Sequence, residues 1–445
     1  MKQITSSEVQ GILSKHLLVD GLDMVLDLEK SQGGYLYDSL RNKKYLDFFT
    51  FFVTNPVGMN HPKMMTREFL DRIACTAVNK PSNSDVYTVE MALFVQTFSR
   101  VAIPESLPHL FLISGGALAV ENCLKAAFDW KVRKNFEKGY KEEKGFQVIH
   151  FRDAFHGRSG YTLSLTNTDP NKTMYFPKFN WPRIPNPVVQ FPITEESLKD
   201  AARREQESID AIHKAIKENP DDIAALIIEP IQAEGGDNHF RKEFFKSLRT
   251  ICDENEILLI FDEVQTGVGL TGKMWCYQHF GVEPDLLAFG KKTHICGMLA
   301  SRRIDEVKDN VFTVSGRINS TFGGSLVDMV RFEKYLEIIE EERLVENAAQ
   351  KGVYLLAGLT NLQKEFPDII SNVRGRGLMC AFDVPNRDIR KNVIDNAFKN
   401  GMIILGCGTH SMRCRPRLNV TEDEIDEAMK ILYLSIKTAE QTICR

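Results

Sequence analysis

Residues 257–291 read ILLIFDEVQTGVGLTGKMWCYQHFGVEPDLLAFGK. Two short apolar runs stand in this stretch, Ile257 to Phe261 and Leu286 to Phe289, and polar or turn-forming residues bound each run, as is typical of buried parallel strands. Asp262 follows the first run directly, and Lys291 follows the second after one glycine, 29 residues beyond Asp262. This separation fits one strand, loop, helix and strand. Both side chains should therefore emerge at the carboxyl edge of a parallel sheet, where such folds bind ligands.

Three more apolar runs alternate with helical patterns between about residues 110 and 290. A helix-spaced apolar set follows the first of them, and basic residues gather near the end of that helix, where they favour its dipole. Residues 192–219 predict a charged surface helix that ends before Pro220. The alternation predicts an α/β fold with a mostly parallel sheet. The runs are Leu110 to Ile113, Val148 to Phe151 and Ala224 to Ile228, and the apolar set is Ala119, Cys123, Ala126, Ala127 and Trp130.

Beyond about residue 325, long helical patterns replace this alternation, and short strands and a final helix follow. Hairpin-like stretches occur in the first sixty residues, and we expect them to complete the same smaller α+β domain. The predicted parts are an N-terminal segment, a large domain and a C-terminal small domain, with bounds 1–65, 66–325 and 326–445. Helices are expected over 326–347, over 348–364 and from 421, strands near 378–383 and 402–405, and hairpins around Tyr35 to Tyr37 and Tyr45 to Phe49.

The composition excludes several classes of protein. The chain has 445 residues, with 56 Lys plus Arg against 60 Asp plus Glu, so it is neither a small stapled scaffold nor a strongly basic nucleic-acid binder. Its nine cysteines are widely spaced and never form CxxC, which favours a reduced protein with no metal site. The N-terminus lacks a signal-peptide pattern, and the apolar runs are far shorter than the ~20 residues that cross a bilayer. We expect a cytoplasmic protein that binds neither membrane nor nucleic acid.

Two motif matches in the opening stretch are misleading. Residues 267–272 fit GxGxxG, but the strand before them ends in polar residues and no helical pattern opens on the third glycine, so we do not expect dinucleotide binding. Gly290 and Lys291 suggest a phosphate-binding loop of the NTPase type. That motif needs a glycine and a hydroxyl residue where this chain has Asp285 and Lys292.

A turn upstream is better suited to a phosphate. The run that ends at Ile113 leads into Ser114, Gly115, Gly116 and Ala117, where a helix starts. Small residues there allow backbone N–H groups and the positive helix end to approach an anion. An ordinary turn would explain this feature alone, and a salt bridge would explain an isolated Asp and Lys. A ligand with a phosphate, an aldehyde for a lysine and a cationic ring nitrogen for an aspartate would use all three, and pyridoxal 5′-phosphate has these groups.

Six stretches spread over most of the chain carry a likeness to a known family: YLDFFTFFVTNPVGMNHP (45–62), FHGRSGYTLSLTN (155–167), IIEPIQAEGGDNHFR (227–241), IFDEVQTGVGLTG (260–272), PDLLAFGKK (284–292) and RINSTFGG (317–324). Together they resemble the class III, or omega, aminotransferases of the aspartate aminotransferase fold. FFTFF, GGALAVEN and FGKKTHICG look most like the lysine 6-aminotransferase branch of this family. The 4-aminobutyrate aminotransferases share FHGR and most of EPIQAEGGDNH.

The resemblance implies a set of cofactor contacts. Lys291 matches the lysine that binds the cofactor aldehyde, with Lys292 as the alternative. Asp262 would keep the pyridine nitrogen protonated, because opposite charges stabilise each other. Gln265 would bond the ring hydroxyl. The other contacts implied are Phe155 and Val264 against the ring, His156 at its border, the backbone of Gly116 and Ala117 at the phosphate, and Thr321 with Asn319 from the neighbouring subunit of a homodimer. Phe155 and Val264 would equally suit a hydrophobic core.

The resemblance also implies how substrates bind. Arg158 matches an arginine that binds a substrate carboxylate, a task for which a planar guanidinium is well suited. Arg413 matches a second carboxylate-binding arginine, and Glu234 matches its movable partner. Arg415 and Arg417, which lie close by in the sequence, are alternatives to Arg413. Glu229 would support the site from behind.

The activity that the resemblance implies is transfer of the terminal amino group of L-lysine to 2-oxoglutarate, giving 2-aminoadipate 6-semialdehyde and L-glutamate. The donor 4-aminobutyrate or ornithine stays open, because pocket shape determines specificity. A racemase or decarboxylase with the same cofactor would need no acceptor, and a non-enzymatic binding protein would show no turnover. The presence of Lys291, Asp262 and Arg158 favours an enzyme.

Overall fold

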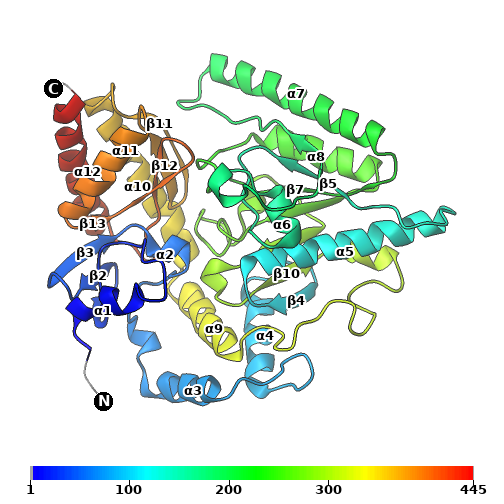
Figure 1. Cartoon of the computed structure of the whole chain (residues 1–445), viewed down its shortest axis with the longest axis horizontal. Coiled ribbons are helices and arrows are strands. Elements are labelled where there is room, and N and C mark those ends of the chain that lie inside the picture. The colour runs from blue at the N-terminus through cyan, green and yellow to red at the C-terminus, as the bar shows by residue number, and fades with distance from the viewer. Residues whose placement is uncertain (1–3, 444–445) are drawn as a thin grey trace.

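The computed structural model describes residues 4–443, which form two lobes side by side (Figure 1). The larger lobe is built on a seven-stranded sheet with the strand order β4-β10-β9-β8-β7-β5-β6. All five runs predicted as strands lie within one residue of the observed bounds. The seven strands are β4 (His109–Ile113), β5 (Gln147–Phe151), β6 (Arg183–Ile184), β7 (Ile223–Ile228), β8 (Leu258–Asp262), β9 (Leu286–Phe289) and β10 (Cys296–Ala300).

The observed sheet differs from the predicted one at strand β10. This strand is not among the predicted strands, and it runs antiparallel to both of its neighbours, β4 and β9. The run Leu110 to Ile113 therefore has an antiparallel partner instead of a parallel one, while the pairs from β9 to β6 are all parallel. The connection from β9 to β10 is too short for a crossover helix, so the chain reverses. Lys291 and His294 make this reversal with φ values of 55° and 56°.

Helix α5 (Gly116–Glu137) directly follows β4 and packs against β7, β9 and β10 of the central sheet (Figure 1). Its predicted apolar set is buried, which confirms the inner face of this helix. Helix α7 (Glu195–Glu218) begins where the Thr194 side chain accepts a hydrogen bond from the N–H of Ser197, and it ends before Pro220 as predicted. Further helices before β8 are α3 (Arg67–Val78), α4 (Val89–Val101), α6 (Gly160–Leu165) and α8 (Lys242–Glu254).

The smaller lobe contains two four-stranded sheets, with the orders β1-β2-β3-β13 and β11-β12-β15-β14. Strand β13 pairs in parallel with β3, with Met402 opposite Leu46, so segments far apart in the sequence share one sheet. The division at about residues 65 and 325 stays a prediction. The elements of the first sheet region are α1 (Ser6–Leu13), β1 (Leu26–Gln32), β2 (Tyr35–Asp38), β3 (Lys43–Asp47), α2 (Thr50–Val53) and β13 (Met402–Ile403). The second sheet has β11 (Ser371–Arg376), β12 (Met379–Asp383), β14 (Leu405–Cys407) and β15 (Ser411–Cys414).

The helices of the C-terminal part differ from the prediction at one boundary. Helix α9 (Leu326–Glu341) ends earlier than expected and α10 (Leu344–Glu365) begins earlier, so the predicted break at residue 347 is wrong. Arg343 causes the break, because its φ of 52° is left-handed and cannot continue a right-handed helix. Helix α11 (Arg387–Lys399) precedes β13, and α12 (Glu422–Ile443) confirms the predicted final helix. Within residues 4–443, no helix has both the length and the apolar character needed to cross a membrane.

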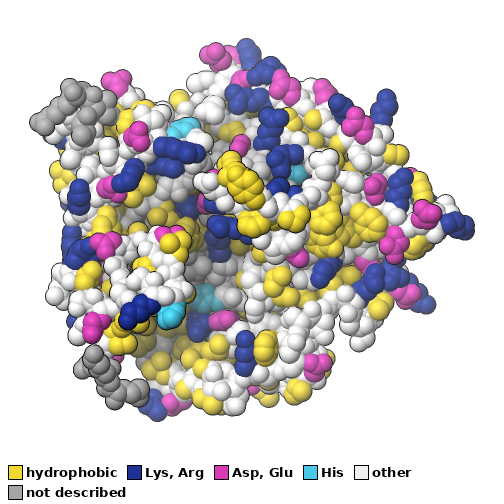
Figure 2. All heavy atoms as spheres, viewed as in Figure 1, with side chains coloured by type: hydrophobic (Ala, Val, Ile, Leu, Met, Phe, Trp, Pro, Cys, Tyr) yellow, Lys and Arg dark blue, Asp and Glu magenta, His cyan; other side chains and the backbone are white. Residues whose placement is uncertain are grey.

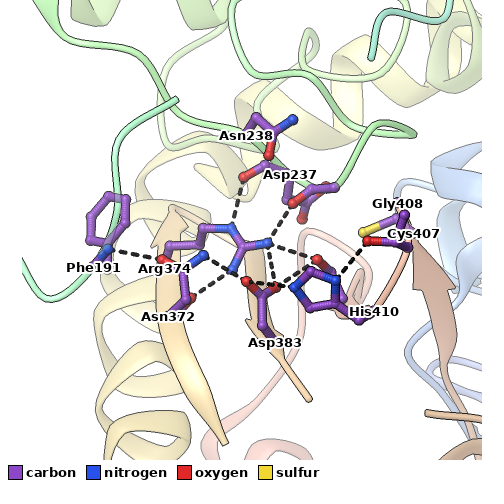
Figure 3. A network of polar contacts seen from close by, with 12 residues as sticks. Phe191, Asp237, Asn238, Asn372, Arg374, Asp383, Cys407, Gly408 and His410 are labelled. Atoms are coloured by element: carbon purple, nitrogen blue, oxygen red, sulfur yellow. Dashed lines mark hydrogen bonds and ion pairs between the residues drawn. The ribbon is translucent and has the colours of Figure 1, made fainter. Parts of the chain in front are cut away.

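A buried polar network joins the smaller lobe to the loop after β7 (Figure 3). Arg374 on β11 is only 2% exposed, and it donates to Oδ1 of Asp383 at 2.8 Å and to the backbone carbonyl of Asp237 at 3.0 Å. Arg415 binds the carboxylate of the same Asp237, with an Nη2 to Oδ2 distance of 2.6 Å. The loop after β7 is therefore held by two buried guanidinium groups of the smaller lobe.

Replacing Arg374 by Met should lower the free energy of unfolding by about 3–5 kcal/mol, because Asp383 stays buried and loses its cationic partner. Denaturant unfolding measures this change. Arg387→Met, at an exposed position in α11, is the matched control and should change the same quantity by less than about 0.5 kcal/mol. A loss below about 1 kcal/mol for Arg374→Met would show that the network contributes little to stability.

Candidate active site

A cavity of about 300 Å³ lies at the carboxyl ends of β8 and β9 and at the start of α5. The molecular surface is hollowed where the two lobes meet, and Lys and Arg side chains gather beside the hollow (Figure 2). The cavity brings most of the predicted site residues together. Its lining residues are Gly116, Ala117, Phe155, His156, Gly157, Arg158, Glu229, Asp262, Val264, Gln265 and Lys291.

Asp262 is the last residue of β8, and its carboxylate is held in place from two sides. Its Oδ2 lies 2.8 Å from Nδ1 of His156, and its Oδ1 accepts a hydrogen bond from the N–H of Val264 at 3.1 Å. His156 is buried, and its Nε2 has no hydrogen-bond partner among the described residues. The contact to His156 keeps Asp262 oriented at the cavity.

Lys291 follows β9 and lines the same cavity. Burial and the nearby Arg413 lower the pKa of Lys291 to about 8, against the opposing effects of Glu234, Asp262 and Glu229. Lys292, the alternative cofactor lysine, points elsewhere, because its Nζ donates to the backbone carbonyl of Gln265 at 2.7 Å. Between the two adjacent lysines, the geometry favours Lys291 as the reactive amine.

The start of α5 offers an anion site beside this lysine. Its N-cap, Gly115, has a φ of 106°, and no side chain caps the helix. A Cβ at Gly116 would lie 3.1 Å from Cγ1 of Val264, so a larger residue there would crowd the cavity wall. Gly157, with a φ of +123°, approaches Ala117 so closely that an added Cβ would lie 2.6 Å from the Cβ of Ala117. The uncapped backbone N–H groups fit a phosphate.

Glu229 links the cavity wall to the loop after β7. Its Oε1 accepts the N–H of Phe155 at 2.9 Å, and its Oε2 accepts the N–H of Ala233 at 3.1 Å. Burial, with Asp262 nearby, raises the pKa of Glu229 well above its usual value. Glu229 therefore positions Phe155 on one side and the loop that carries Glu234 on the other.

The three arginines of the RCRPR segment have separate partners. Nη2 of Arg413 lies 3.4 Å from Oε2 of Glu234. Arg415 binds Asp237, and Arg417 binds Glu424. Of the three, Arg413 is therefore the one that faces Glu234.

Arg158, the other predicted carboxylate ligand, is exposed at the cavity mouth, with its Cζ 6.0 Å from the centre of the Phe155 ring. Asn319 and Thr321 do not line the cavity of their own chain. Both residues are exposed, and the carbonyl of Thr321 accepts a hydrogen bond from the Ser84 hydroxyl at 3.4 Å. The structure therefore does not bring these two residues to the cavity of their own chain.

Phe52 is a site residue that the sequence analysis missed. Residues Thr50–Val53 all have φ values between 44° and 66°, a left-handed turn that costs about 1–2 kcal/mol per residue outside glycine. Asp47 supports the turn by accepting the N–H groups of Phe49 and Thr50 at 2.9 Å and 2.7 Å. The turn places the Phe52 ring 5.6 Å from Nζ of Lys291 and 5.7 Å from Cζ of Arg413. The FFTFF run indicated the place, but neither helix nor strand periodicity predicts this conformation.

Lys172 is the second residue that was missed. Its Nζ donates to Oε1 of Glu234 at 2.6 Å and lies 5.4 Å from the centre of the Phe155 ring. The residue stands in a loop between α6 and β6, where no periodic pattern marks it. The site is therefore more strongly cationic than the sequence predicted.

Comparisons with known proteins agree with this geometry. The family model Aminotransferase class-III matches residues 19–436. The L-lysine-epsilon aminotransferase of Mycobacterium bovis is 52% identical over 96% of this chain and 94% of its own length. The mitochondrial 4-aminobutyrate aminotransferase of Homo sapiens is 31% identical over 93% of this chain and 87% of its own length.

A solved structure supports the same family. The lysine aminotransferase from Mycobacterium tuberculosis, in the internal aldimine form, matches this fold with a TM-score of 0.96 and 51% identity, over 98% of this chain and 100% of that chain. The mostly parallel central sheet and the smaller lobe agree with the predicted aspartate aminotransferase-like fold. This chain belongs to the class III aminotransferases.

Proposed function

We propose that this protein is an L-lysine 6-aminotransferase, which transfers the terminal amino group of L-lysine to 2-oxoglutarate and releases 2-aminoadipate 6-semialdehyde and L-glutamate. The observation that carries this proposal is the meeting of Lys291, Asp262 and the uncapped start of α5 in one cavity. The near full-length similarity to L-lysine-epsilon aminotransferases supports lysine as the donor over 4-aminobutyrate or ornithine.

The cofactor of this enzyme is pyridoxal 5′-phosphate, and the residues of the cavity fit it. When bound, the cofactor supplies an aldehyde that reacts with amines and a cationic ring that withdraws electrons from the neighbouring carbon. Lys291 would bind the aldehyde, and Asp262 would bind the ring nitrogen and keep it protonated. The remaining contacts are proposed for Gln265 at the ring hydroxyl, Phe155 and Val264 at the ring faces, His156 behind Asp262, and the N–H groups of Gly116 and Ala117 at the phosphate.

Lys291 also has the properties of the base that moves protons. Its pKa of about 8 lies close to neutral pH, so a useful fraction of the amine is unprotonated there. We assign to Nζ of Lys291 the transfer of the proton from the amine-bearing carbon of the substrate. Asp262 stays oriented by His156 throughout, because the hydrogen bond between them is buried.

The two substrates differ in charge, and Glu234 with Arg413 would reconcile them. We propose that Arg158 binds the α-carboxylate of L-lysine, so that the ε-amine reaches the aldehyde position of the cofactor beside Lys291 while Glu234 neutralises Arg413. For 2-oxoglutarate, the Glu234 carboxylate would move aside and Arg413 would bind the second carboxylate. The 3.4 Å contact between Glu234 and Arg413 supports this pairing.

We further propose a homodimer in the cytoplasm. Asn319 and Thr321 support the dimer, because both are exposed outside the cavity of their own chain. They would reach the phosphate of the partner's cofactor. The wide spacing of the nine cysteines and the absence of CxxC from the sequence support a reducing compartment.

A panel of amino donors with 2-oxoglutarate tests the proposed activity. We expect L-lysine to give the highest kcat/KM, with glutamate formed in equal amount to a product aldehyde that cyclises. Ornithine and 4-aminobutyrate should be at least about tenfold poorer, since tenfold needs only about 1.4 kcal/mol of difference in transition-state binding. A clear preference for 4-aminobutyrate or ornithine would overturn the lysine assignment.

The pH dependence of cofactor uptake tests the electrostatics at Lys291. The neutral amine is the reactive form, so the uptake rate by cofactor-stripped protein should rise with pH, with a midpoint at about pH 8. Arg413→Met removes a nearby cation and should move the midpoint up. Glu234→Gln removes a nearby anion and should move the midpoint down. The free cofactor titrates identically in all three experiments, so the shifts report on the protein. Shifts of the opposite sign would contradict the assignment.

A further inference from the structure

Glu234 faces two cations. Its Oε1 accepts a hydrogen bond from Nζ of Lys172 at 2.6 Å, whereas its Oε2 lies 3.4 Å from Nη2 of Arg413. The first distance is that of a charge-assisted hydrogen bond, and the second is longer than such bonds. Nη1 of Arg413 is buried and has no hydrogen-bond partner within the described part of the chain. Glu234 is thus held more closely by Lys172 than by Arg413.

Lys172 stands at the rim of the cavity. It ends the short helical turn Pro170–Lys172, which begins where the Asp169 side chain accepts the N–H of Asn171. The Lys172 side chain is 19% exposed, so its ammonium is partly shielded from water. Its Nζ lies over the ring of Phe155, which lines the cavity. Lys172 therefore reaches Glu234 from a different part of the fold than β15, which carries Arg413.

The backbone around Glu234 is fixed. The carbonyl of Glu234 accepts the N–H of Gly408 at 2.8 Å, and the N–H of Ala233 donates to Glu229. Arg374 holds the carbonyls of Gly236 and Asp237 further along the loop. Because these contacts restrain the backbone of the loop, rotation of the Glu234 side chain moves its carboxylate away from Arg413 without moving the loop. Lys172 is already within hydrogen-bond distance of that side chain.

The charge of Glu234 makes a second partner important. Burial opposes ionisation, but Arg413 and the hydrogen bond from Lys172 together hold the pKa of Glu234 below its usual value. A partly buried carboxylate that left Arg413 without another cation would lose most of the charge compensation that offsets its burial. A carboxylate that keeps Lys172 avoids most of this loss.

We propose that Lys172 is a positioning residue that holds the Glu234 carboxylate while Arg413 binds the second carboxylate of a dicarboxylate substrate. The proposal rests on the proposed function, in which Glu234 and Arg413 separate for 2-oxoglutarate and stay paired for L-lysine. Lys172 need not touch either substrate. Its effect should therefore fall on dicarboxylate substrates and leave L-lysine largely unaffected.

Lys172→Met tests this proposal in the holoenzyme. Single-turnover kinetics with L-lysine and with L-glutamate start from the same enzyme form, so their ratio isolates the response to the second carboxylate. We expect kcat/KM for L-glutamate to fall about tenfold and that for L-lysine to change less than about twofold, where tenfold corresponds to about 1.4 kcal/mol. Calorimetry gives a readout without turnover. Glutarate should bind about tenfold more weakly, whereas butyrate, which has one carboxylate, should bind as before.

Three further variants make the test specific. Lys172→Arg keeps the cation and should restore glutarate binding to within about threefold of wild type. Lys178→Met removes a lysine of the same segment that, among the described residues, donates to the backbone carbonyls of Thr173 and Phe176, and it should leave the lysine-to-glutamate ratio unchanged. Lys172→Met should have no further effect on glutarate binding in a Glu234→Gln background, because the group it holds is then absent.

The outcomes separate this inference from the proposed function. Equal losses for L-lysine and L-glutamate, unchanged glutarate binding, or the same effect from Lys178→Met would each overturn the role of Lys172. If L-lysine were not the donor, the glutamate and glutarate measurements would still report on Lys172. If the enzyme reacts normally with L-lysine but Lys172→Met does not weaken glutarate binding, the role of Lys172 is overturned and the proposed function stands.

Discussion

The register between β8 and β9 is the constraint on which the site depends. Asp262 lies opposite Ala288 in this parallel pair. The chain beyond Ala288 therefore reaches the same sheet edge at which β8 ends with Asp262. The left-handed φ of Lys291 then turns the chain away into β10. A shift of one residue in this pairing would turn the carboxylate or the following chain to the other face of the sheet. The juxtaposition of amine and carboxylate is thus a property of the sheet rather than of a flexible loop.

Charge balance is the second property that unifies the site. Arg413, Lys172 and Lys291 stabilise the charged form of Glu234, while Glu234 and Asp262 oppose the effect of Arg413 on Lys291. Each cation disfavours the charged form of the other cations, and each anion offsets this effect. The loop that carries Glu234 is held to the smaller lobe by Arg374 (Figure 3). The rigid frame therefore leaves rotation of single side chains as the means by which the site adjusts to substrates of different charge.

Much of this arrangement could be predicted from the sequence, for identifiable reasons. The apolar runs that became β7, β8 and β9 are buried on both faces, so they stand out without alternation. Asp262 was found because it directly follows such a run, and Lys291 because it follows the next run after one glycine. The apolar spacing of α5 likewise predicted its buried face.

The features that escaped prediction depend on backbone conformation or on long-range contacts. Strand β10 follows a short reversal at Lys291 and His294, where two residues other than glycine adopt positive φ. Phe52 reaches the site through a left-handed turn that no periodicity reveals, and Arg343 breaks a helix in the same way. Lys172 is connected to the site by an ion pair with Glu234, a residue 62 positions away. Such contacts exist only in the folded chain.

The most direct test is to locate the lysine that carries the cofactor. Borohydride reduction of the purified holoenzyme makes the bond between lysine and cofactor permanent, and fragmentation mass spectrometry of the peptide around residues 284–292 then distinguishes the two adjacent lysines. We expect the added mass on Lys291, an unmodified Lys292, and no reducible attachment in Lys291→Ala. Attachment at Lys292 or at a lysine outside this peptide, or a folded wild-type protein that never binds the cofactor, would contradict the site described above.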